Sequence, residues 1–307
     1  MDLNLIESFL AAGVALATPL LFAALGELLM EKSGVIDIAL EGKMLAAAFF
    51  AVLVAYWTQS PALGLLAGMV AAVVLALLFA FFVLYLQVDQ IIIGAGMNML
   101  ALGLTGVLYR ELFGMTGQTI TVPTFSAWPV PLLRHLPVLG RSLFQQNILV
   151  YLALLSVGLV AFLLRRTRFG LYLRAVGDSP AAADAAGVHV PRIRLLAILL
   201  GGLACGLAGA FLSIAHANTF VEGMTAGRGF IALAIVIFAR WNPIGAFFIA
   251  LLFGLASALQ FQFQAFGVAL PYQIVLMLPY ILTLVVAALM GLRATPPQAL
   301  ARPYFRE

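Results

Sequence analysis

The fold is decided by stretches such as residues 62–86, which read ALGLLAGMVAAVVLALLFAFFVLYL and contain no charged residue. A helix needs about 20 mostly apolar residues to cross a bilayer, so this run is long enough to span one. The whole chain has the same character: 64% of its 307 residues are hydrophobic and 9% are charged, against about 25% charged in soluble domains. A soluble globule of this size could not bury so much apolar surface. The sequence therefore predicts an integral membrane protein.

Similar apolar runs predict nine spanning segments: 8–30, 35–57, 62–86, 90–110, 147–164, 195–217, 226–240, 243–261 and 271–292. The seventh is short, because its strongly apolar part runs only from Phe230 to Ala239. A re-entrant or broken helix is the alternative there, since such backbone is tolerated where protein or a water-filled cavity covers it. The predicted fold class is all-α: a polytopic membrane helical bundle of about 8–10 transmembrane helices, forming one domain over residues 1–307.

Charged residues in the loops orient these helices. The loop 165–194 holds six arginines, and the positive-inside rule places it in the cytoplasm with the basic C-terminal tail. Counting back five spans places the N-terminus outside, where Asp2 and Glu7 precede the first span without a basic residue. The proline-containing loop 111–146 is then extracytoplasmic and is expected to form an irregular cap. The net charge of +4 reflects cytoplasmic loops rather than nucleic-acid binding.

Several kinds of catalytic motif are missing from the sequence. Gly42-Lys43 lacks the upstream glycine and the following Ser or Thr of a P-loop, and neither a His/Glu metal motif nor a Gly-x-Ser-x-Gly elbow occurs. The single cysteine, Cys205, allows neither an internal disulfide nor a multi-cysteine metal site. We expect a transport protein rather than an enzyme, with no catalytic residue, metal site or cofactor of its own. Uphill transport would take its energy from an ion gradient or from another subunit.

The most informative segment lies in the basic loop and reads SPAAADAAG over residues 179–187. Ser179 is a favoured N-cap, Pro180 suits the first helical turn, and the following alanines are strong helix formers. Gly187 is the expected residue just past the helix end, and Pro191 is expected to stop any restart. The predicted helix of about two turns contains Ala183, Asp184, Ala185 and Ala186. A helix this short is marginal alone, and docking to a partner or a role as a surface linker fits it equally.

Three stretches resemble one family of membrane proteins. The residues RAVGDSPAAADAAG at 174–187 are similar to the coupling-helix loop of ABC importer permeases of the branched-chain amino acid, ribose and nucleoside group. The residues EKSGVIDIALEGKML at 31–45 and MTAGRGFIALAIVIFARWNP at 224–243 resemble blocks of the nucleoside-type permeases, and the likeness covers essentially the whole chain. Asp37 departs from that subfamily, which would have asparagine there, and it adds a possible charge near the pathway.

The resemblance implies a specific assembly. Two permease subunits, a longer one and a shorter one that 307 residues would fit, would sit side by side in the bacterial inner membrane. Each would rest its coupling helix on a cytoplasmic ATP-binding subunit, which would bind the ATP. An extracytoplasmic lipoprotein or periplasmic binding protein would deliver the solute. The expected solute is a nucleoside, with simple sugars or a flavin-like compound as alternatives.

Polar side chains at membrane depth are costly, and they usually face a bundle interior or a cavity. Asp37 and Glu41 share one face if their stretch is helical, where a structural polar anchor is the alternative to a pathway role. Asn98 lies beside glycines and suits either a neutral polar solute or an interhelical hydrogen bond. The candidate pathway residues are Asp37, Glu41, Asn98 and Glu222.

Other polar residues also allow more than one interpretation. Glu27 and Glu31 lie near a helix end, where placement at the membrane interface fits as well as a functional role. Trp241 is interpreted as an interfacial anchor in an inner turn. If Asp37 or Glu41 bound a coupling ion, the chain would be a self-sufficient secondary transporter or channel. The helix at 179–187 favours the ATP-driven importer, because a secondary transporter needs no docking helix there.

Overall fold

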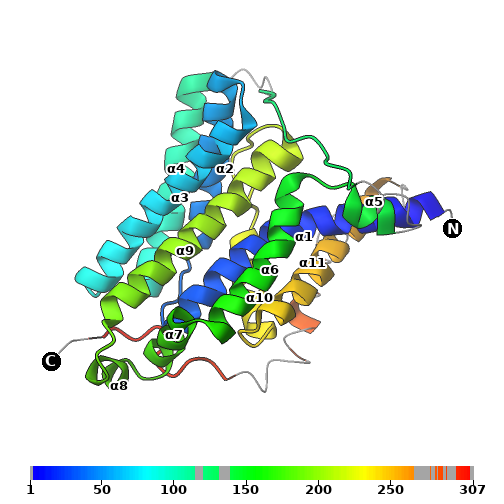
Figure 1. The fold of residues 1–307 in the computed structure, drawn as a ribbon. Coiled ribbons are helices and arrows are strands. Elements are labelled where there is room, and N and C mark those ends of the chain that lie inside the picture. The colour runs from blue at the N-terminus through cyan, green and yellow to red at the C-terminus, as the bar shows by residue number, and fades with distance from the viewer. Residues whose placement is uncertain are drawn as a thin grey trace.

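The computed structural model describes residues 3–114, 120–130, 139–265 and 295–304, with a few positions between 277 and 288. The regular structure of these residues is helical, apart from an isolated bridge between Ala127 and Asn147. The helices form an elongated bundle, and the two chain ends lie at opposite ends of it (Figure 1). The prediction of an all-α helical bundle is confirmed.

Seven helices in the described part of the chain are long and apolar enough to cross a membrane. They are α1 (Leu3–Lys32), α2 (Leu40–Thr58), α3 (Pro61–Ala80) with its π-helical extension η1 (Phe81–Tyr85), α4 (Gln90–Phe113), α6 (Ile148–Arg166), α9 (Val190–Ala210) with its π-helical extension η3 (Phe211–Ala217), and α11 (Pro243–Ala265). The shorter helices are α5 (Leu139–Phe144), α7 (Arg168–Asp178), α8 (Pro180–Ala185) and α10 (Arg228–Phe238).

Capping side chains explain where several helices begin. The Asp89 carboxylate accepts a hydrogen bond from the N–H of Ile91 at 2.8 Å at the start of α4. The Thr167 hydroxyl accepts one from the N–H of Gly170 at 3.1 Å at the start of α7. These bonds satisfy N–H groups that have no partner within the helix. Thr167 thereby turns the chain from α6 into α7 within a single residue.

The predicted spans agree with the seven long helices, with boundaries that differ by a few residues. The segment 226–240 is not a full span: α10 has 11 residues and is about 16 Å long, half of a hydrocarbon core of about 30 Å. The short helix agrees with the alternative of a re-entrant or broken helix for this segment. The ninth predicted span, 271–292, lies largely outside the described residues.

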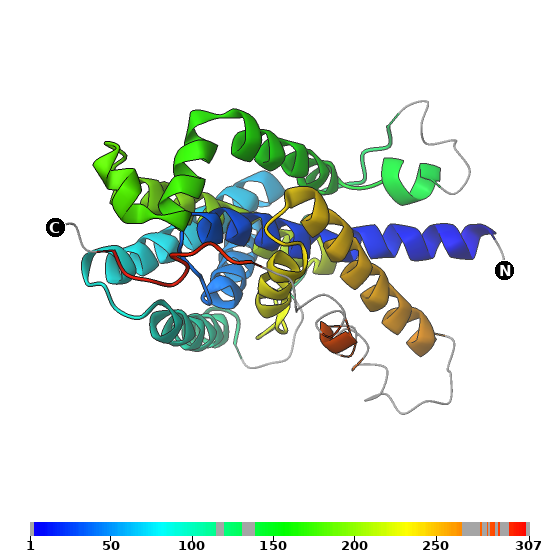
Figure 2. The same cartoon turned by 90° about the horizontal axis from the view of Figure 1, so that it is seen from below.

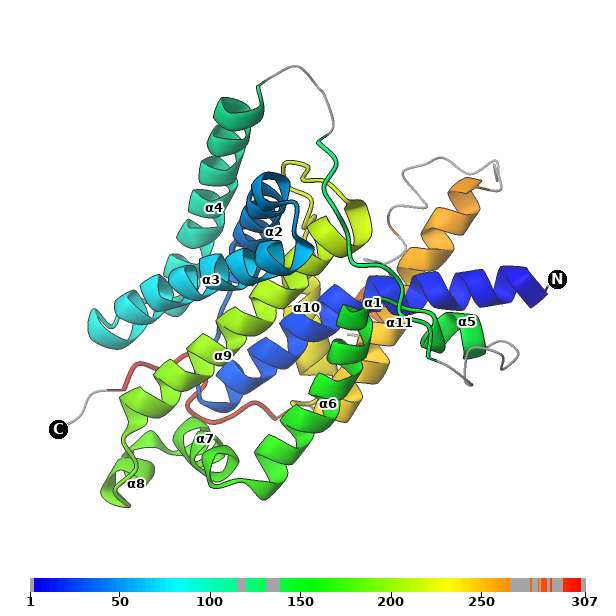
Figure 3. The ribbon, with the colours of Figure 1, turned by 45° about the horizontal axis from the view of Figure 1, so that its top comes forward.

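Helix α9 runs through the middle of the bundle and contacts α1, α2 and α3 (Figure 3). Glycines on α9 and α1 make this close packing possible. A Cβ atom on Gly206 would lie 2.6 Å from the Cα atom of Met69 in α3, and one on Gly26 of α1 would lie 2.8 Å from the Cβ atom of Ala204. No side chain fits at such distances, so the backbones pack directly against one another.

The two ends of the bundle differ in structure. The N-terminal part of α1 lies beside α5, near the described parts of the loop 111–146 (Figures 1 and 2). At the opposite end, α7 and α8 are joined by the C-terminal tail. The N–H of Ala299 donates to the carbonyl of Gly177 at 2.9 Å, and the N–H of Ala301 donates to that of Gly34 at 3.1 Å. The tail therefore crosses both α7 and the α1–α2 connection.

Candidate functional site

The half-length helix α10 begins against a side chain from another segment. Its N-cap, Gly227, has a φ of +80°, which glycine adopts without strain. One carboxylate oxygen of Glu41 accepts a hydrogen bond from the N–H of Gly227 at 2.7 Å, and the other accepts one from the N–H of Gly229 at 2.7 Å. Glu41 therefore meets the positive end of the α10 dipole and fixes the start of α2 against α10.

Asn98 joins α4 to the same region. Its amide oxygen accepts a hydrogen bond from the N–H of Gly42 at 2.7 Å, and its amide nitrogen donates to the carbonyl of Ile38 at 2.9 Å. Both partners are backbone groups on either side of the α2 N-terminus. Of the two interpretations of Asn98, the structure shows the interhelical hydrogen bond.

Asp37 forms a fully buried ion pair. One of its carboxylate oxygens accepts from the ammonium of Lys43, and the other accepts from the N–H of Ala39 at 2.9 Å. The Lys43 ammonium also lies 4.5 Å from the ring centroid of Phe79. A buried charge is tolerated when it is paired and hydrogen-bonded, and both members of this pair are.

Glu27, Glu31 and Trp241 complete this region, which we call the buried polar junction and define as Glu27, Glu31, Asp37, Lys43 and Trp241. Glu27 Oε1 accepts from the N–H of Asp37 at 3.0 Å, and Glu31 Oε2 accepts from the indole N–H of Trp241 at 2.5 Å. The interpretation of Trp241 as an interfacial anchor is wrong, because its side chain is buried and tied to α1. Glu27 and Glu31 are also buried inside the bundle rather than exposed at a helix end.

Segment 37–43 thus brings three of the four predicted pathway residues together, each bonded to a protein group. Glu222 lies elsewhere, in the connection between η3 and α10. The Arg110 guanidinium of α4 donates to its two carboxylate oxygens at 2.9 and 2.7 Å. Because of these bonds, the pKa of Glu222 lies below its ordinary value.

A cleft of about 600 Å³ opens beside this pair, along α4. Its lining residues are Met99, Leu102, Gly103, Gly106, Val107, Arg110, Glu222 and Gly223. The side chains of Arg110 and Glu222 are 54% and 37% exposed, so the ion pair faces the cleft rather than the core. Figure 3 shows α4 at the margin of the bundle, where one of its faces is uncovered. This open face combines glycines with an ion pair, which is unusual for a surface that meets only lipid.

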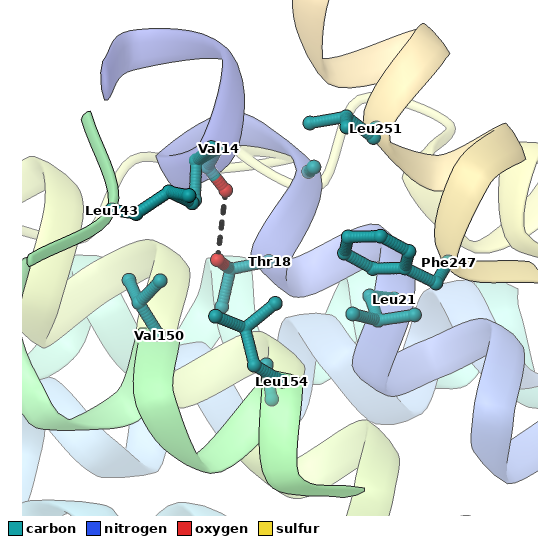
Figure 4. A pocket seen from close by; sticks show the side chains of 10 residues that line it. Val14, Thr18, Leu21, Leu143, Val150, Leu154, Phe247 and Leu251 are labelled. Carbon is teal, nitrogen blue, oxygen red and sulfur yellow. Dashed lines mark hydrogen bonds between the residues drawn. The ribbon is translucent and has the colours of Figure 1, made fainter. Parts of the chain in front are cut away.

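A second pocket has the opposite character. It lies between α1, α6 and α11, and apolar side chains surround the one hydroxyl of Thr18 (Figure 4). That hydroxyl already donates to the carbonyl of Val14 at 2.9 Å. With a volume of about 40 Å³, the pocket is too small for a sugar or nucleoside. The α4 cleft is therefore the better candidate for a polar solute.

The short helix predicted over residues 179–187 is present as α8, Pro180–Ala185. It ends in a Schellman motif: the N–H of Val188 donates to the carbonyl of Ala183 at 2.9 Å, and that of Gly187 donates to the carbonyl of Asp184 at 2.8 Å. Gly187 has a φ of +86°, as predicted for the residue after the helix. The C-terminal part of the helix is therefore closed by local hydrogen bonds.

One face of α8 is exposed and the other is anchored. Ala183 is buried, and the Asp184 carboxylate accepts from the hydroxyl of Tyr304 at 2.9 Å. The exposed residues are Ala181, Ala182, Ala185, Ala186 and Gly187. A small, flat, solvent-facing surface is thus presented by a helix whose back is held by the C-terminal tail.

Two local expectations need correction. Ser179 is the N-cap residue, but its side chain makes no capping hydrogen bond; its carbonyl accepts from the N–H of Ala183 at 3.0 Å. Pro191 does not stop a new helix, because α9 begins at Val190 with Pro191 in its first turn. Proline is favourable there, since the N–H that it lacks would have no helical partner.

Sequence reasoning missed α7 and the contacts of the tail. The apolar spacing of Phe169, Leu173 and Val176 is that of an amphipathic helix, but the segment is too short for a span. Arg194, counted with the cytoplasmic arginines, is buried. Its guanidinium donates to the carbonyls of Ser33 at 3.2 Å and Arg302 at 3.1 Å. No signal in the sequence connects these positions.

Within the described residues, no group of three or more His, Cys, Asp or Glu side chains is placed to hold a metal ion. The carboxylates of the buried polar junction are joined to Lys43, Trp241 and backbone N–H groups. These contacts fix α1, α2 and the α10–α11 turn against one another.

Comparisons with known proteins agree with this picture. The model of a protein family described as "Branched-chain amino acid transport system / permease component" matches residues 9–288. The guanosine ABC transporter permease protein NupQ of Bacillus subtilis is 36% identical over 100% of this chain and 99% of its own length. The nucleoside ABC transporter permease protein NupC of Lactococcus lactis is 35% identical over 96% of each chain.

A relative with a different solute in its name is also similar. The putative glucose ABC transporter permease protein TsgC13 of Haloferax volcanii is 40% identical over 85% of this chain and 79% of its own length. No solved structure matches this chain significantly.

Proposed function

This chain belongs to the family of branched-chain amino acid transport system permease components, and on that premise we propose that it is the permease subunit of an ATP-driven importer for a nucleoside. The observation that carries the proposal is the full-length similarity to two permeases named for guanosine and nucleosides. The seven helices that are able to span a membrane supply the transmembrane part of such a subunit. Its location in this proposal is the cytoplasmic membrane of a bacterium.

In this proposal, α8 docks onto a cytoplasmic ATP-binding subunit. Its exposed alanine surface allows a close fit, and the Schellman turn at Gly187 leaves little slack in the return segment. Tyr304 and α7 then carry the motion to α1, since the tail bonds to Asp184, to α7 at Gly177 and to the α1–α2 connection at Gly34. The ATP is bound and hydrolysed by the partner.

The solute route follows the open face of α4. The cleft offers the mixture of glycine backbone, apolar side chains and one ion pair that a partly polar solute needs. The N-terminus of the broken helix α10 would otherwise attract an anion, but Glu41 already occupies it. In the cleft itself, the charges of Arg110 and Glu222 offset each other, so a neutral solute fits better than an anionic one, which agrees with a nucleoside.

A second permease subunit covers the α4 face in this proposal. Met99, Leu102 and Val107 are exposed there beside Gly103, where an added Cβ atom would meet nothing within 4 Å. Small residues at an open helix face allow another helix to approach closely. The solute then moves between the two permeases and is delivered from outside by a substrate-binding lipoprotein or periplasmic protein.

The proposal is tested by reconstitution with the neighbouring ATPase, second permease and binding protein, followed by uptake of labelled guanosine, adenosine, uridine, glucose and fructose. ATP-dependent uptake of nucleosides that unlabelled nucleosides compete away is expected. Uptake of the sugars alone would overturn the nucleoside assignment in favour of the sugar permease that the similarity to TsgC13 suggests. Uptake that persists without the ATPase and stops when ion gradients are collapsed would favour the secondary transporter.

A further inference from the structure

Glu27 and Glu31 lie one turn apart on α1, and both side chains are essentially inaccessible to solvent, with 0% and 1% exposure. Residues four positions apart lie on the same face of a helix, so the two carboxyl groups are neighbours on α1. The proposed transport function uses neither residue directly. Their surroundings nevertheless restrict how many of the two carboxyl groups are ionised.

Only one of the two oxygens of each carboxyl group accepts a hydrogen bond from a donor in the described residues. Oε1 of Glu27 accepts from the N–H of Asp37, and Oε2 of Glu31 accepts from the indole N–H of Trp241. The remaining oxygens, Oε2 of Glu27 and Oε1 of Glu31, are buried and have no donor among the described residues. Two carboxylates cannot satisfy each other, because both only accept hydrogen bonds.

The charges around Glu27 and Glu31 also disfavour the ionisation of both carboxyl groups. The ionisable groups that act on it are Asp37 from the α1–α2 connection, Lys43 from α2, Lys32 from α1 and the thiol of Cys205 from α9. Among the described residues, the cations that act on the pair are Lys43, which Asp37 already neutralises, and the half-buried Lys32, so two ionised glutamates would carry excess negative charge, which is strongly unfavourable in a low-dielectric interior.

We propose that Glu27 and Glu31 form a protonation site that holds one proton between them in the folded protein. A carboxyl O–H of one residue then donates to the free oxygen of the other, so one proton satisfies both orphaned oxygens. It also removes one of the two excess charges. The shared proton is part of the contact that holds the end of α1 against Asp37 and the Trp241 turn.

Infrared spectroscopy detects this proton directly, because a protonated carboxyl group and an ionised carboxylate absorb at different frequencies. The full-length permease in a detergent without ester groups should show the carbonyl band of a protonated carboxyl at pH 7, and the band should shift in D2O. Glu27→Gln and Glu31→Gln should each remove it. Glu111→Gln, at an exposed carboxylate on α4, is the matched control and should leave it unchanged.

A spectrum of the wild-type protein without such a band, or a band that survives both substitutions, overturns the proposal. Titration of the wild-type band gives a result even if a variant fails to fold: the band should disappear at alkaline pH together with a fall in the thermal unfolding midpoint. If added NaCl raises this midpoint at neutral pH and choline chloride does not, a sodium ion rather than a proton occupies the site.

The conservative variants separate a shared proton from packing alone. In Glu27→Gln, the amide N–H group donates to Glu31 permanently, so the unfolding midpoint at pH 7 should stay near that of the wild type and its alkaline fall should vanish. Glu27→Leu places an apolar side chain of similar size there and supplies no hydrogen-bond donor. This variant should have a lower unfolding midpoint at every pH. Equal behaviour of the two variants contradicts the shared proton.

Discussion

The coupling segment, residues 179–188, and the buried polar junction are held together by opposite kinds of contact. In the coupling segment, the bonds that close the helix join residues three to five positions apart, such as Val188 to Ala183. In the junction, Trp241 reaches Glu31 across 210 residues, and Glu27, Asp37 and Lys43 converge from a helix, a connection and a second helix. The first region is exposed and the second is buried.

This difference explains what each region can do. The coupling segment is a short local element, so it can form before the ATP-binding subunit is present. It can also be broken without unfolding the bundle. The buried polar junction exists only after α1, α2 and the α10–α11 turn have packed. Damage to the coupling segment should therefore uncouple transport, whereas damage to the junction should reduce stability.

The largest effect is expected for Lys43→Met. This substitution leaves Asp37 buried without its cation, and removal of one partner of a buried ion pair costs about 3–5 kcal/mol. The thermal unfolding midpoint of the purified permease should fall sharply. Lys32→Met, the same change at a half-buried lysine at the end of α1, is the matched control. Equal midpoints for the two variants would show that the junction contributes little to stability.

Ala183→Pro is expected to cause a large loss of transport without a large loss of stability. The N–H of Ala183 donates to the carbonyl of Ser179 at 3.0 Å, and an interior proline costs about 3 kcal/mol. The variant should insert normally and bind loaded donor protein, yet ATP hydrolysis should no longer respond to that protein. Ala182→Pro should be milder, because position 182 lies in the first helical turn, where N–H groups lack helical partners.

The control for this pair is Ala181→Ser, which preserves the helix and should couple normally. If Ala183→Pro supports wild-type uptake, the coupling role of α8 is lost, and an ion-coupled transporter becomes the better explanation.

An intermediate effect is expected for Asn98→Leu, because Asn98 joins α4 to the start of α2. The change leaves the N–H of Gly42 and the carbonyl of Ile38 without partners, at about 1–3 kcal/mol for each buried unsatisfied group. Stability should therefore fall, while the KM for solute of the protein that remains folded stays unchanged. A raised KM at unchanged stability would instead return Asn98 to the solute pathway. Leu100→Met, at an exposed residue of α4 that does not line the cleft, is the control.

The smallest effect is expected for Glu222→Gln. The ion pair with Arg110 is exposed, so the unfolding midpoint at pH 7 should be indistinguishable from that of the wild type. Because the pKa of Glu222 is lowered in the folded protein, its contribution is present above the ordinary value near 4.5 and is lost as the pH falls through the folded pKa. Any small difference between the two unfolding curves should therefore disappear at low pH, where Glu222 is protonated. A large difference at pH 7 would contradict the exposed position of the pair.

Much of the fold was accessible from the sequence because its signals are local. Apolar runs such as 62–86 predicted the spanning helices, and the sequence from Ser179 to Gly187 predicted a helix with a left-handed residue after it. The resemblance in 31–45 and 224–243 indicated the permease family. The short apolar part of 226–240 indicated a broken helix, although it did not reveal that Glu41 caps it.

The sequence by itself determined that the chain is made for a membrane, where most of its helices lie, and that a short capped helix follows Ser179, because apolar length, capping and turn chemistry act over a few residues. Only the tertiary structure decided the partners of the polar side chains. The sequence allowed both pathway and structural roles for Asp37, Glu41 and Asn98, and the tertiary structure shows which protein groups each side chain contacts. A buried charge is stable or costly according to what lies within a few ångströms of it, and that neighbourhood is assembled by packing rather than by order along the chain.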